Sequence, residues 1–114
     1  MPGISIHVVD VSRGMVAEGM QVELHGPDRK LIARGALGAN GMLDDAALGQ
    51  TLVPGLYRAI FHLAAYYRAA GVALPAVPFL DVVTYDFGIA EPAQHYHLPL
   101  KCTPWGYSCF RGGA

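Results

Sequence analysis

Apolar and polar residues alternate along much of this chain, which is the period expected of strands that bury one face. In the first run Ile4, Ile6 and Val8 form the apolar row, so His7 is expected to point away from the buried face. Turn-forming Gly, Pro, Asn and Asp residues separate the successive runs. The predicted strands cover residues 4–9, 20–25, 30–35, 56–63, 79–87, 95–102 and 107–111.

The run Ala-Ala-Tyr-Tyr-Arg-Ala-Ala at residues 64–70 predicts one short helix, which ends at Gly71. Many short strands with regularly spaced turns favour a sandwich or a barrel. A chain of 114 residues also suits a single core. We therefore expect an all-β fold in one domain that spans residues 1–114.

The composition limits the class of partner. The chain is 53% hydrophobic and only 15% charged, which predicts that part of its surface is buried against other copies. Its net charge is −1 and its cations are scattered, so a nucleic-acid partner is not expected. Apolar stretches are interrupted well before the roughly 18 to 20 residues that a bilayer span needs, and the first residues lack the pattern of a signal peptide. A cytoplasmic protein with no membrane partner is expected.

Two cysteines, Cys102 and Cys109, flank a predicted turn. A disulfide between them is geometrically conceivable. Because no secretion signal is recognised, we expect reduced thiols instead.

The predicted strand 95–102 carries the side chains best suited to chemistry. His95 and His97 point to the same side, opposite to Leu98 and Leu100, with their rings about 7 Å apart. An imidazole transfers protons near neutral pH, so this pair suits activation of a water molecule. Two alternatives stay open, namely solvated surface histidines and a zinc site in which His7 is the third nitrogen ligand.

The same run carries a resemblance to a known family. Residues 95–113, H-Y-H-L-P-L-K-C-T-P-W-G-Y-S-C-F-R-G-G, closely resemble the terminal signature of the transthyretin-related 5-hydroxyisourate hydrolases, H-Y-H-x-P-L-L-x-S-P-x-G-Y-S-T-Y-R-G-S. Residues 6–10, I-H-V-V-D, resemble the family's H-V-L-D strand, and the expected Gly14, Ala17 and Gly19 follow. The resemblance covers nearly the whole chain. It implies a transthyretin-like two-sheet antiparallel β-sandwich with one short helix, assembled as a homotetramer (a dimer of dimers).

The resemblance also implies a hydrolysis that needs neither metal nor cofactor. His7 and His97 would be the catalytic pair, which positions and deprotonates a water that opens the six-membered ring of 5-hydroxyisourate, a small purine-derived molecule. His95, Arg111 and Gly113 are further candidates for substrate binding. The alternative is a transthyretin-like small-molecule binding protein with little or no catalysis, although retention of both His7 and His97 argues against it.

Two departures from the family pattern bear on the substrate. The family's loop N-x-D-G-R corresponds here to residues 38–42, G-A-N-G-M, so Met42 stands where an arginine is expected. A thioether neither binds an anion nor donates a hydrogen bond, but it packs against methyl groups. We therefore expect Met42 to contact an N-methylated 5-hydroxyisourate, such as the trimethyl form that caffeine oxidation would supply. The alternative is that Met42 only fills space. The terminal Y-R-G-S has become F-R-G-G at residues 110–113, so any contact from the serine is lost.

Overall fold

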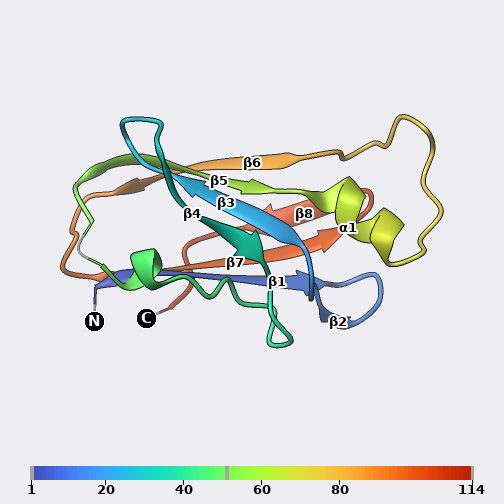
Figure 1. The fold of residues 1–114 in the computed structure, drawn as a ribbon, viewed down its shortest axis with the longest axis horizontal. Coiled ribbons are helices and arrows are strands. Elements are labelled where there is room, and N and C mark those ends of the chain that lie inside the picture. The colour runs from blue at the N-terminus through green and yellow to red at the C-terminus, as the bar shows by residue number, and fades with distance from the viewer. Residues whose placement is uncertain (1, 51, 114) are drawn as a thin grey trace.

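Strands of the computed structural model, which describes residues 2–50 and 52–113, form two stacked sheets (Figure 1). One sheet has the strand order β2-β1-β7-β8 and the other has the order β4-β3-β5-β6. The strands are β1 Gly3–Asp10, β2 Met15–Val16, β3 Gln21–His25, β4 Leu31–Ala36, β5 Gly55–Phe61, β6 Val83–Ile89, β7 His95–Thr103 and β8 Gly106–Cys109. Neighbouring strands in the described residues run antiparallel, apart from β1 and β7, which are parallel. The predicted two-sheet sandwich is confirmed.

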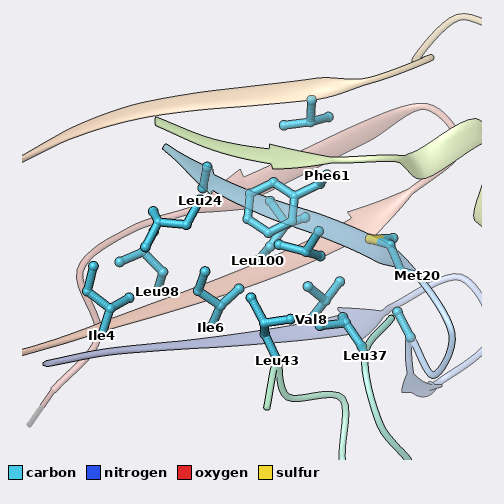
Figure 2. Close-up of a cluster of buried hydrophobic side chains, with 14 of the residues drawn as sticks. Ile4, Ile6, Val8, Met20, Leu24, Leu37, Leu43, Phe61, Leu98 and Leu100 are labelled. Carbon is cyan, nitrogen blue, oxygen red and sulfur yellow. The ribbon is translucent and has the colours of Figure 1, made fainter. Parts of the chain in front are cut away.

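The core lies between the two sheets and is built from the apolar rows that the sequence predicts. Ile6 of β1 and Leu98 and Leu100 of β7 face Leu24 and Phe61 of the second sheet, and each of the five is at most 2% exposed (Figure 2). Burying one such side chain contributes about 1.5 to 3 kcal/mol. Side chains alternate along a strand, so this core forces the intervening residues of β1 and β7 onto the outer face of their sheet.

The helix α1, Leu63–Ala69, confirms the predicted short helix within one residue at each end. No helix in the described parts of the chain is long and apolar enough to cross a membrane. A short 3-10 helix, η1 Ala46–Gly49, is an addition that the sequence patterns did not predict. Asp45 begins it, because its carboxylate accepts a hydrogen bond from the Ala47 backbone N at 2.9 Å.

Three predicted strands have clearly different bounds in the structure. The strand predicted at 56–63 is wrong at its end, because β5 ends at Phe61 and Leu63 is the first residue of α1. The strand predicted at 79–87 is wrong at its start, because β6 begins only at Val83, where pairing with Phe61 of β5 begins. Residues before it follow an irregular path, in which the Asp81 carbonyl accepts a hydrogen bond from the Ala64 backbone N. The strand predicted at 107–111 ends earlier, at Cys109, so Arg111 lies beyond β8.

A buried carboxylate ties the end of β1 to α1, and Figure 1 shows the helix at that end of the sandwich. Asp10 is 0% exposed and accepts hydrogen bonds from Arg13 Nε at 2.8 Å, Tyr67 Oη at 2.9 Å and Tyr66 Oη at 3.1 Å. Burial alone would raise the pKa of Asp10. These donors and the Ser12 hydroxyl outweigh it, so the pKa lies below the usual value. Asp10 is therefore a structural acceptor that fixes where β1 ends.

Candidate active site

The candidate residues of β1 and β7 meet on the outer face of the first sheet. Parallel pairing places Ser5 opposite His97 and His7 opposite Pro99. Directly opposed residues point to the same side of a sheet, so His7 and His97 are diagonal neighbours. Both histidines are half-buried, whereas the residues on either side of each histidine in its own strand are buried. The two predicted catalytic rings are thus brought together from opposite ends of the chain.

The connection between β4 and β5 brings Met42 to the same face. Its backbone runs beside β1, where Val8 N donates to Gly41 O at 3.0 Å and Leu43 N donates to Ile6 O at 3.2 Å. These bonds make an antiparallel bridge between Met42 and His7. Leu43 is buried in the core, and alternation therefore turns Met42 outward beside the His7 ring.

Gly41 allows this close approach. Its φ is +73°, a conformation that side chains disfavour, and a Cβ there would lie 2.8 Å from Cβ of Val16. The glycine of the loop is therefore required by geometry, and it determines that residue 42 is the one placed opposite His7.

The C-terminal segment covers the other side of β7. Gly112 N donates to the His97 carbonyl at 2.7 Å and forms a bridge with that residue. Arg111, one residue earlier, points away from the two histidine rings. Its guanidinium carbon lies 3.9 Å from the centre of the Tyr96 ring, and the group donates to the carbonyl of His95 at 3.3 Å. In this single chain Arg111 therefore stands apart from the histidines, and Gly113 is exposed beyond it.

A serine that the sequence patterns did not single out joins the two histidines of β7. Ser5 Oγ lies 2.6 Å from Nδ1 of His97 and 2.8 Å from Nε2 of His95. The alternation of β1 already put Ser5 on the face of His7, but its contact with β7 depends on a parallel register that local patterns do not contain. The sequence patterns also did not identify the contact of Gly112 with His97, because it likewise depends on pairing between separate segments of the chain.

The electrostatic surroundings favour a neutral ring at His97. Burial lowers the pKa of His97 below its usual value, and the neighbouring His7 and His95 rings lower it further. A neutral imidazole keeps one nitrogen lone pair, so His97 can accept a proton from water at neutral pH.

The site is an open sheet face. A hollow of about 540 Å³ lies away from this face and is lined by residues of β3, β5 and β6 that include His25, Arg58 and Asp86. No group of three or more His, Cys, Asp or Glu residues in ranges 2–50 and 52–113 is arranged to hold a metal ion, and His7, His95 and His97 do not form one. Cys102 and Cys109 are both free thiols.

The chain is similar to known proteins along nearly its whole length. Residues 4–112 match the model of the HIUase/Transthyretin family. A 5-hydroxyisourate hydrolase of Pseudomonas aeruginosa is 40% identical over 116 residues, which cover 98% of this chain and 92% of that protein. The structure of the Klebsiella pneumoniae 5-hydroxyisourate hydrolase superposes with a TM-score of 0.81 at 30% identity, covering 99% of this chain and 100% of that one. A crystal structure of (S)-allantoin synthase gives a TM-score of 0.89 at 32% identity and covers 97% of this chain, which corresponds to 43% of that longer chain.

Proposed function

Because this chain belongs to the HIUase/Transthyretin family and is a hydrolase, we propose that it opens the six-membered ring of 5-hydroxyisourate or of an N-methylated derivative. The observation that carries this proposal is the convergence of His7, His97 and Met42 on one outer sheet face. His7 and Met42 are paired through the backbone, and His97 lies diagonally across the parallel strands. Two imidazoles and one apolar thioether side chain thus share this face.

The chemistry assigned to this face is addition of water to a cyclic amide. A water held between the rings of His7 and His97 attacks the ring carbonyl, and neutral His97 accepts one of its protons. The tetrahedral intermediate then collapses, and the C–N bond of the ring breaks. The nitrogen leaves with the proton that His97 returns, so one water is consumed and the products are a carboxyl group and an N–H group. His7 holds the water and the developing oxyanion by hydrogen bonding.

In this proposal the side chain of Met42 contacts the substrate and favours a methylated ring nitrogen. Its thioether faces the same surface as His7, with no cation from residue 42 to bind a polar ring edge. A methyl group against this side chain gains about 0.8 kcal/mol from burial. An N-methylated 5-hydroxyisourate is therefore the preferred substrate.

A homotetramer, built as a dimer of dimers, would turn this open face into an enclosed channel. Its support is the exposure of large apolar side chains at the ends and edges of the first sheet. Val11 is 53% exposed, Trp105 is 61% exposed and Tyr107 is 47% exposed. Large exposed apolar side chains near one another mark surfaces of association, so these residues are the proposed contacts between copies.

The deciding experiment follows the ultraviolet absorbance of freshly made 5-hydroxyisourate and of its trimethyl analogue. Each decay is compared with the spontaneous decay in the same buffer, because an uncorrected rate would mislead. Catalysed decay of either compound supports the proposal, and decay at the spontaneous rate for both contradicts it. The assay is repeated after exhaustive chelation, since loss of activity together with stoichiometric zinc would favour the three-histidine metal site.

A further inference from the structure

The hydroxyl of Ser5 lies between two imidazole nitrogens. It is 2.6 Å from Nδ1 of His97 and 2.8 Å from Nε2 of His95, and all three residues are half-buried. The parallel register of β1 and β7 holds it there, because Ser5 is paired directly with His97 and both side chains share one face. Both contacts have the length of good hydrogen bonds.

The number of protons limits how these contacts can form together. A hydroxyl donates one hydrogen bond, and a neutral imidazole has one nitrogen that donates and one that accepts. Ser5 can therefore donate to only one of the two rings, and any ring to which it does not donate must donate to it. If it donates to His95, then Nδ1 of His97 carries the proton and Nε2 of His97 keeps its lone pair. If it donates to His97 instead, Nε2 of His97 is protonated and that ring is no longer a base.

We propose that Ser5 is a positioning residue. Its hydroxyl donates a hydrogen bond to Nε2 of His95 and accepts one from Nδ1 of His97, which holds His97 in the tautomer with the proton on Nδ1. This inference rests on the proposed function, because it supplies the base that the hydrolysis requires. Ser5 acts through His97 and does not itself contact the reacting atoms. His95 receives a role as well, as the acceptor that fixes the direction of the hydroxyl.

The first test is Ser5→Ala, with Ser5→Thr as the variant that restores a hydroxyl on a strand residue. Loss of the two hydrogen bonds should lower kcat by about 10-fold or more with little change in KM, and threonine should recover most of the rate. Ser108→Ala is the matched control, because that hydroxyl is exposed on β8. An unchanged kcat in Ser5→Ala would overturn the proposal.

The second test reads the tautomer without reference to activity. Nitrogen-15 chemical shifts of histidine-labelled protein distinguish a protonated Nδ1 from a protonated Nε2. The wild type should show His97 protonated on Nδ1, and Ser5→Ala should lose this preference. His95→Gln keeps an acceptor near the position of Nε2 and should preserve the tautomer, whereas His95→Leu should not.

These two readouts separate the inference from the proposed function. If the wild type fails to hydrolyse either substrate but His97 shows the expected tautomer, only the function is contradicted. If hydrolysis occurs while His97 is protonated on Nε2 in the resting protein, the role of Ser5 is contradicted and the function stands.

Discussion

Gly112 lies so close to His97 that a side chain at this position would collide with the imidazole. Its backbone N donates to the His97 carbonyl at 2.7 Å, and a Cβ at this position would lie 2.6 Å from Cδ2 of the His97 ring. Cβ atoms essentially never approach a ring this closely, so the segment limits which positions the ring can occupy.

Substituting Gly112 should therefore disturb the base more than the fold. In Gly112→Ala the His97 ring must move, and a displacement at the reacting group should lower kcat/KM by about 10-fold to 100-fold. Gly49→Ala is the control, because a Cβ there meets nothing within 4 Å. Steady-state rates and thermal unfolding are measured on both variants. Equal rates in the two would show that the ring is not held by this contact.

The two histidines should act together through one water. His7→Asn and His97→Asn should each lower the catalysed rate by about 100-fold or more, and the double variant should lose little beyond either single one. Both variants should fold, since each ring lies on the outer face of its sheet and not in the core. Circular dichroism checks the fold, and near-normal rates in both variants would remove these residues from the mechanism.

The bridge between Met42 and His7 predicts a change of substrate preference. Met42→Arg places a cation on the outer face beside His7, and a charge-assisted hydrogen bond to a polar ring edge is worth about 1.5 to 3 kcal/mol. The ratio of kcat/KM values should therefore move toward unmethylated 5-hydroxyisourate by about 10-fold to 150-fold. Met42→Leu is the matched control and should keep the wild-type preference. A ratio that Met42→Arg leaves unchanged would mean that Met42 only fills space.

The Asp10 cluster predicts how stability depends on pH. The folded pKa of Asp10 lies below its unfolded value of about 3.9, so its contribution is complete above that value and is lost as pH falls through the folded pKa. Asp10→Asn should cost about 2 to 3 kcal/mol at neutral pH through weaker bonds from Arg13, Tyr66 and Tyr67. Its stability should also fall less steeply in acid. Urea unfolding between pH 7 and pH 2 measures both effects.

Asp86→Asn is the control for that experiment. Asp86 also pairs with an arginine, Arg58, at 2.7 Å, but both side chains are more than half exposed. An exposed pair contributes little, so this variant should unfold much like the wild type. If Asp86→Asn lowered the free energy of unfolding as much as Asp10→Asn does, burial would not explain the contribution of Asp10.

Assembly can be measured directly. Sedimentation at micromolar concentration should give a mass of about four subunits, and Trp105→Glu should weaken the association, because it places a charge on a side chain that is now 61% exposed and apolar. A monomeric wild type would contradict the enclosed site.

The sequence by itself determined which face of each strand is buried. In β1 and β7 the rows of Ile6 and Leu98 turn His7 and His97 outward, because a one-residue change of register would expose the whole apolar row. The helix at Leu63–Ala69 could also be predicted from its own residues, and so could the glycine that ends it. The residue beside His7 was predictable only through the family resemblance, which identified Met42.

Only the tertiary structure decided which strands meet. β1 and β7 are about ninety residues apart in the chain, and their parallel register brings Ser5 to His97 within 2.6 Å. The same packing gives Gly112 its place against that ring and turns Arg111 onto Tyr96. Alternation along one strand specifies a face but no partner, since pairing between distant strands depends on how the whole core packs. The contacts that orient the catalytic candidates therefore arise from the folded sheet.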